Sequence, residues 1–204
     1  MDYQSAFKKP FLDIKKLVIG ILLSIIPIVS FFSVGYVLEV AKSTIQKKKD
    51  LPEWTNWKEL FVHGLIGTVI GIIYVMPAII IGLLAIGGGL LKGLVTNSVL
   101  SGIKTGAPLL IAAILLLLVS SYIAPMAIIA YAKSWKFKDA FNFSDIFKKI
   151  MTSKYLIVWI LSMVVSVVAL GIFAVIPLVG SAIASFTTAV IFMTLFAQVY
   201  TEVK

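Results

Sequence analysis

Three stretches of 28 residues or more contain no charged residue, and their lengths limit what the chain can fold into. Residues 64–91 and 105–132 each span 28 residues, and residues 155–200 span 46. A helix of about 20 apolar residues crosses the roughly 30 Å hydrocarbon core of a bilayer. The first two stretches therefore predict one crossing each. The third would reach about 70 Å as a single helix, so it predicts two crossings with a turn at Pro177.

Composition places the chain among membrane proteins. Its residues are 60% hydrophobic and 13% charged, with a mean hydropathy of +1.07, whereas soluble domains carry about 25% charged residues. We therefore expect an all-α, polytopic helical membrane protein with a single membrane domain, 1–204. The absence of cysteine excludes disulfides, zinc-thiolate centres and cysteine nucleophiles. We expect no cofactor and no bound metal, and nothing before the first apolar run resembles a cleavable signal peptide.

The basic residues are all lysine, and this limits the partners. There are 18 lysines and no arginine, against nine acidic residues. Without guanidinium groups the chain lacks the usual means of binding phosphate in a bidentate manner, so nucleic acid is not an expected partner. Excess lysine in so apolar a chain indicates membrane topology and anionic lipid. The expected partners are the lipid bilayer and anionic lipids, and a membrane-protein partner or a homo-oligomer stays open.

Pro27 lies inside the first apolar stretch, residues 17–38, which is long enough for one crossing or for two short limbs. With one crossing, lysines divide six to twelve between the two sides of the membrane. If the chain turns back at Pro27, 16 lysines lie on one side and two on the other. Cytoplasmic segments are the lysine-rich ones. We therefore favour the hairpin, with both termini cytoplasmic, and a single crossing is the alternative.

About six transmembrane or re-entrant helical limbs follow from these stretches. Two amphipathic helices are expected at the membrane interface, with aromatic residues facing lipid and lysines facing water or anionic headgroups. Proline-centred hairpins at both ends give the chain a palindromic order, which is compatible with an inverted repeat or with chance. The expected segments are a hairpin 11–45 around Pro27, an interfacial helix 52–63, central spans 64–86 and 107–132, an interfacial helix 137–150 and a hairpin 154–200 around Pro177.

Several residues are candidates for defined roles. The expected interfacial anchors are Trp54, Trp57, Phe61, Phe143 and Phe147. The expected contacts with anionic lipid or a partner are Lys47, Lys48, Lys49, Lys148 and Lys149. Helix breaks or turns are expected at Pro27, Pro77, Pro125 and Pro177. Gly67 and Gly71 have the spacing of a close helix contact, within the bundle or in a dimer. The glycine-rich segment 87–108 predicts a short surface helix, with a lid over a substrate path as the alternative.

The sequence resembles a known family at several words. These are "GYVLEV", "LPEWTNWKELFVHGL", "IIYVMPA", "IPLVG" and "LFAQVYTE". The most specific part is the pattern of Trp, Leu, Phe and Gly within the second word, Leu51 to Gly64. These words resemble the prokaryotic membrane family known as domain of unknown function 4013. That resemblance implies a small multi-pass protein in the cytoplasmic (plasma) membrane of archaea or bacteria, and it implies no activity.

Polar residues offer little chemistry. Glu59 and His63 have the i, i+4 spacing of two metal ligands, but no third ligand is near in sequence, so a hydrogen-bonded interfacial pair is favoured. Glu39 is expected at the interface, paired with Lys42 or Lys15, and a position inside the helix bundle is the alternative. We expect no catalytic residue and no enzymatic activity, although Glu59, His63 and Asp145 are the cluster to test. The favoured function is a small permease-like or accessory membrane subunit. The alternatives are a lipid- or partner-binding structural module and, least favoured, an enzyme acting on lipid.

Overall fold

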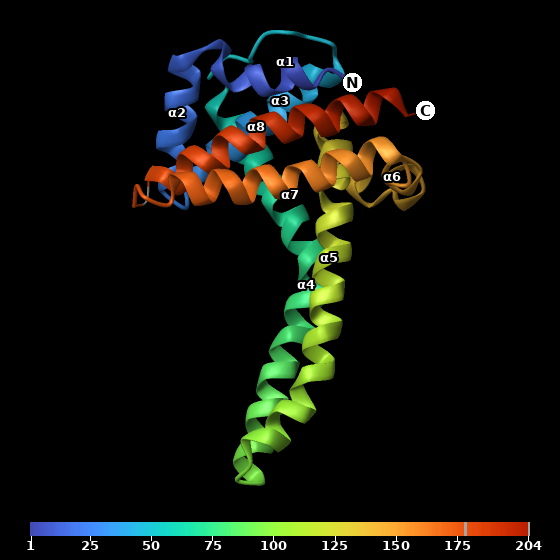
Figure 1. Ribbon diagram of the computed structural model, residues 1–204. Coiled ribbons are helices and arrows are strands. Elements are labelled where there is room, and N and C mark those ends of the chain that lie inside the picture. The colour runs from blue at the N-terminus through green and yellow to red at the C-terminus, as the bar shows by residue number, and fades with distance from the viewer. Residues whose placement is uncertain (178, 204) are drawn as a thin grey trace. The chain divides into compact units, whose positions relative to one another are not determined.

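The computed structural model describes residues 1–177 and 179–203, and regular structure in this part of the chain is helical throughout (Figure 1). The all-α class predicted from the sequence is confirmed. Four of the described helices are long and apolar enough to cross a membrane. They are α4 (Trp57–Val95), α5 (Val99–Ser134), α7 (Ser153–Phe173) and α8 (Val179–Glu202). The expected count of six limbs is therefore not confirmed.

The first apolar stretch forms a helical hairpin that turns at Pro27. Helix α2 (Ile14–Ile25) begins at Asp13, whose side chain accepts a hydrogen bond from the Lys16 backbone N–H, and α3 (Ser30–Ile45) packs against α2. Between them Ser30 donates its backbone N–H to the Ile26 carbonyl at 2.7 Å. With 12 and 16 residues, the two helices reach about 18 and 24 Å, less than the hydrocarbon core. Pro27 is a turn and not a kink within one span.

The chain divides into two compact units where the sequence predicted one domain. The first unit holds Met1–Ile70 and Pro125–Lys204, and the second holds Gly71–Ala124. Helices α4 and α5 each contribute residues to both units. The first unit also contains two short N-terminal elements that the sequence did not predict, α1 (Tyr3–Lys8) and the 3-10 helix η1 (Lys9–Leu12).

Helix α8 is the centre of the first unit. It packs against α1, α2, α3 and α7, and 61% of its most apolar stretch is buried. Leu195 and Val190 are almost fully buried, and Phe186 packs with Tyr36 and Val40 of α3. Helix α8 thus holds α1, α2, α3 and α7 together.

Helices α3 and α4 meet with their backbones in contact at two glycines of the first unit. A Cβ added at Gly35 would lie 1.9 Å from the carbonyl oxygen of Leu60, and one added at Gly64 would lie 1.8 Å from that of Phe31. No side chain fits at such distances, so glycine is required at both positions. Gly67 continues this contact, since a Cβ there would lie 2.7 Å from Leu38 Cδ1. Of the two roles expected for Gly67, a close contact within the bundle or in a dimer, the structure shows the contact within the bundle.

The predicted interfacial helix 52–63 is not a separate element. Residues 51–56 lie outside any helix, and Trp57 begins α4, which runs on to Val95 without a break. The interfacial helix expected at 137–150 is two elements, the 3-10 helix η2 (Phe137–Phe141) and α6 (Phe143–Ile150). Asn142 separates them, because its side chain accepts the backbone N–H of Asp145 and thereby starts α6.

The second hairpin matches its expected bounds closely. Helix α7 ends at Phe173 and α8 begins at Val179, so Pro177 lies in the turn between two packed helices. Pro77 and Pro125, by contrast, do not break their helices, since both lie inside the continuous ranges of α4 and α5. Leu178, next to Pro177, is outside the described residues.

In the second unit α4 and α5 run side by side and meet at a tight turn, residues 96–98 (Figure 1). The segment 87–108, expected to form a short surface helix, instead forms the ends of these two helices. Small residues explain the difference, since a Cβ on Gly102 would lie 2.5 Å from the Gly89 carbonyl oxygen. Backbones that approach this closely allow both helices to continue to the turn.

Candidate functional site

The first four residues of the most specific string, Leu51 to Trp54, lie in a loop that ties α2 to α3. The Trp54 indole lies on the Tyr36 ring with centroids 4.0 Å apart, and its Nε1–H donates to the Lys16 carbonyl at 3.2 Å. The Tyr36 hydroxyl donates to the Pro52 carbonyl at 3.0 Å. Lys16 Nζ donates to the Leu51 carbonyl and, at 2.7 Å, to Glu53. These contacts give the motif a structural role.

His63 lies in an aromatic stack that joins three helices of the first unit. Its Nδ1 is 2.9 Å from the Tyr131 hydroxyl, and its ring lies 3.7 Å from the Trp135 ring at an interplanar angle of 11°. Lys42 Nζ lies over the Trp135 ring, 4.7 Å from its centroid. Such an ammonium–indole contact is worth about 0.5 to 2 kcal/mol. Trp135 has a φ of 57°, which turns the chain just after α5.

The structure adds no third metal ligand to Glu59 and His63 among the described residues. Within residues 1–177 and 179–203, no three His, Asp or Glu side chains lie close enough to hold a metal ion. Glu59 is exposed, and in the described part of the chain it forms neither an ion pair nor a hydrogen bond with His63. Tyr131 and Trp135 take the place that the sequence assigned to Glu59.

Glu39 faces a polar pocket of about 380 Å³ that it shares with Lys42, Lys48 and Asp50. Burial raises the pKa of the Glu39 carboxyl, and nearby Lys42 partly opposes this. Among the described residues Glu39 has no ion pair within 4.0 Å. The expected pairing with Lys42 or Lys15 is therefore absent at contact distance, although Lys42 is near.

A second buried cluster surrounds Tyr200 near the end of α8. The Tyr200 hydroxyl donates to Asp145 Oδ2 at 2.7 Å, and Lys149 Nζ lies 3.8 Å from Asp145 Oδ1. Lys149 Nζ also lies 4.7 Å above the Tyr200 ring, donates to the Val203 carbonyl, and is joined at the ring by Lys133. Asp145 thus contacts Tyr200 and Lys149, and it does not meet Glu59 or His63 in any described contact.

Lys149 differs from the other expected lipid-contact lysines because it is buried, with 6% of its surface exposed. The helix α6 turns it inward toward Asp145 and α8. Lys47, Lys48, Lys49 and Lys148 are exposed, and none forms an ion pair in the described part of the chain. Their contact with anionic lipid stays a prediction.

The expected aromatic anchors lie in two different environments. Trp57, Phe143 and Phe147 are 45%, 50% and 41% exposed, as an interfacial role requires. Trp54 is held in the loop described above, and the Phe61 ring packs against Phe31 and Phe32 at 5.7 and 5.2 Å. In α6 the aromatic and aliphatic residues lie in different environments, since Ile146 and Ile150 are buried whereas Phe143 and Phe147 are exposed.

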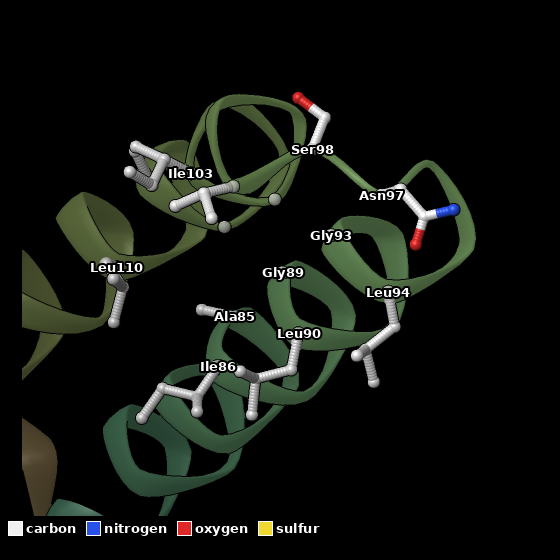
Figure 2. A pocket seen from close by; sticks show the side chains of 14 residues that line it. Ala85, Ile86, Gly89, Leu90, Gly93, Leu94, Asn97, Ser98, Ile103 and Leu110 are labelled. Atoms are coloured by element: carbon white, nitrogen blue, oxygen red, sulfur yellow. The ribbon is translucent and has the colours of Figure 1, made fainter.

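A groove of about 600 Å³ lies at the ends of α4 and α5 in the second unit (Figure 2). Ile86, Leu90 and Leu94 follow one side of α4, and Asn97 and Ser98 lie at the turn. No charged residue lines it. A smaller pocket of about 390 Å³ in the first unit is lined by Pro125 together with Ser162 of α7 and Thr188 of α8. The Ser162 and Thr188 hydroxyls donate to carbonyls of their own helices.

Sequence reasoning missed three groups that the fold brings together: the Tyr131–Trp135 pair, Tyr200, and buried Lys9. Tyr131 and Trp135 lie one helical turn apart at the lysine-rich end of an apolar stretch, which was an available signal. Lys9 gave no signal, because its burial depends on α1 and α8, whose contact is not encoded in any local pattern.

The fold and these clusters define an all-helical protein with four apolar helices long enough to span a membrane and a polar, lysine-rich set of connecting segments. Comparison with protein families matches residues 18–184 to the protein family of unknown function DUF4013, so the chain belongs to that family. The resemblance seen in the sequence is confirmed. Comparison with curated proteins gave no match, and comparison with solved structures gave none either.

Proposed function

We propose that this protein is an accessory subunit of a membrane assembly in the cytoplasmic membrane of a prokaryote. One observation carries the proposal: the apolar side chains of α7 are largely exposed. Only 6% of the most apolar stretch of α7 is buried, against 61% for α8. Val164, Val167 and Val168 are 55%, 70% and 53% exposed. A face of this kind suits lipid chains or the packed helices of a partner.

The charge pattern supports an accessory role over ion-coupled transport or catalysis. No acidic residue occurs between Glu59 and Asp139, although ionisable groups inside spans are the usual mark of coupling pathways. His63 is already engaged by Tyr131 and Trp135. We therefore propose that the protein has no enzymatic activity and that any transport belongs to the assembly. Its lysine-rich segments and both termini face the cytoplasm in this proposal.

A photo-crosslinking amino acid at Val167 tests the proposal in intact cells. The expected result is one discrete adduct with an integral membrane protein, which also copurifies with the unmodified chain at constant stoichiometry. The same amino acid at Lys138, an exposed residue of η2, is the control and should not give that adduct. A monomer in mild detergent that forms adducts with lipid alone would overturn the accessory role.

A lipid-binding module is the second candidate, and the four exposed lysines without ion pairs favour it. Each lysine near an anionic surface contributes about 1 kcal/mol of attraction. Native mass spectrometry from micelles containing equal phosphatidylglycerol and phosphatidylcholine tests this. Replacing Lys47, Lys48 and Lys49 with Gln should abolish phosphatidylglycerol retention. Replacing the exposed residues Lys8, Lys15 and Lys58 gives the same change of charge as a control and should leave retention intact; equal loss in both variants would contradict a lipid-binding module.

A further inference from the structure

A cavity of about 440 Å³ in the first unit gathers lysines from distant parts of the chain. It lies among the N-terminal elements α1 and η1, the end of α3, and the end of α8. The charged groups that line it are Lys9, Lys47, Lys48, Lys49, the Met1 amino group, Asp2 and Glu202. Five positive groups therefore face two carboxylates in the described wall.

Lys9 is the unusual member, because its side chain is buried without a carboxylate partner. It is 4% exposed, and its Nζ donates to Thr44 Oγ1 at 2.9 Å. No carboxylate of the described residues lies within 4.0 Å of it. Burial lowers the pKa of Lys9, and the more distant Asp50 partly opposes this. An ammonium has three N–H donors, and a buried charge without a counter-ion is costly.

The two carboxylates in the wall are already engaged by other groups. Glu202 pairs with the Met1 amino group at 2.5 Å and with Lys154 at 2.6 Å. Asp2 begins α1, where its side chain accepts the Ser5 backbone N–H at 2.9 Å. Among the described residues, Lys9 and the three lysines after α3 therefore have no carboxylate within 4.0 Å, and the nearest compensating charge at Lys9 is the more distant Asp50.

The end of α3 presents those three lysines together. The Lys48 backbone N–H donates to the Ser43 carbonyl at 2.9 Å, and Lys47 adopts a left-handed φ of 61°. This closes the helix, and Lys47, Lys48 and Lys49 then line the cavity. Lysine binds phosphate as a point charge, and a phosphate monoester carries about −1.5 to −2 at neutral pH. A multivalent anion is thus matched to the surplus charge.

We propose that this cavity binds a phosphate group, with Lys9 as the buried anchor and Lys47, Lys48 and Lys49 at the mouth. The phosphate is that of a lipid headgroup or of a soluble phosphate compound, which share this chemistry. The site holds whether or not the chain has a protein partner, so failure of the accessory role leaves it standing. It also differs from general surface attraction, because one buried side chain dominates it.

Calorimetric titration of the full chain in zwitterionic detergent, at constant ionic strength, tests the proposal. The probes are inorganic phosphate and dihexanoyl phosphatidic acid. Both should bind the unmodified protein, and Lys9→Gln should weaken binding at least tenfold. Lys8→Gln removes the same charge from an exposed neighbour outside the cavity and should bind as tightly as the unmodified chain. Tighter binding of the lipid identifies a headgroup site, and equal binding identifies a site for soluble phosphate.

Lys48→Gln provides a second variant with an exposed side chain, so its folding is not at risk. It should weaken binding several-fold while thermal unfolding stays unchanged. The proposal is overturned if neither probe binds, if Lys9→Gln binds normally, or if Lys8→Gln loses as much affinity as Lys9→Gln.

Discussion

The Trp54 indole lies flat on the Tyr36 ring, with centroids 4.0 Å apart and an interplanar angle of 7°. This contact links the loop before α4 to the buried face of α3. Trp54→Ala should lower the free energy of unfolding by about 2 to 3 kcal/mol, because it removes the stack and the hydrogen bond to Lys16. Thermal unfolding in detergent measures the loss. Trp57→Ala is the comparison and should cost less, because this ring is 45% exposed, although it also lies against Trp54 and Phe32.

Gly64 should not tolerate even one methyl group. Its added Cβ would lie 1.8 Å from the Phe31 carbonyl oxygen, whereas one at Gly87 of the same helix meets nothing within 4 Å. We expect Gly64→Ala to lower the yield of folded protein sharply. Gly87→Ala should be neutral or should stabilise the helix by up to about 1 kcal/mol. Size-exclusion profiles of the two variants compare them directly, and equal profiles would refute the close contact.

Asp145 should contribute more to the stability of the fold than its position on a short helix suggests. Asp145→Ala removes the acceptor of the Tyr200 hydroxyl and the carboxylate beside buried Lys149. The expected cost is about 2 kcal/mol of unfolding free energy. Adding Lys149→Met to this variant should restore part of the loss, since the unpaired buried charge is then gone. A double variant less stable than Asp145→Ala would contradict this arrangement.

Stability should rise with pH through Lys9. Burial lowers the pKa of Lys9 from its ordinary value of 10.5. The unfolded chain then holds this proton more tightly than the folded chain, so the free energy of unfolding increases as pH rises from the folded pKa to 10.5. Unfolding midpoints at about pH 7 and about pH 10 measure this. Lys9→Met should lose the increase in stability that Lys9 contributes, whereas Lys8→Met should keep it. Identical pH dependence in the unmodified protein and both variants would refute the role of Lys9.

The sequence predicted the helix turns well because proline and glycine act locally. Pro27 and Pro177 both lie in turns between packed helices, as the distribution of lysine and the length of the last apolar stretch indicated. Pro77 and Pro125 show the limit of that reasoning, since both lie inside continuous helices. A proline is tolerated there when neighbouring groups satisfy the freed carbonyl, and sequence alone does not show those neighbours.

Side-chain roles were less predictable because they depend on contacts between distant segments. Lys148 and Lys149 are adjacent in sequence, yet one is exposed and the other is buried beside Asp145 and Tyr200. His63 was paired with Glu59 on helix periodicity, but its contacts are with Tyr131 and Trp135, 68 and 72 positions away. Periodicity gives the face of a helix and not the element that covers it.

Membrane topology is the central claim, and single-cysteine labelling measures it most directly because the chain has no cysteine of its own. A membrane-impermeant maleimide is added to intact cells that carry Asn97→Cys, at the turn between α4 and α5, or Lys48→Cys, after α3. We predict that Asn97→Cys is labelled from outside and that Lys48→Cys is labelled only after the membrane is permeabilised. Labelling of Lys48→Cys in intact cells would contradict the account, in which the chain turns back at Pro27 and both ends of this hairpin lie on the cytoplasmic side.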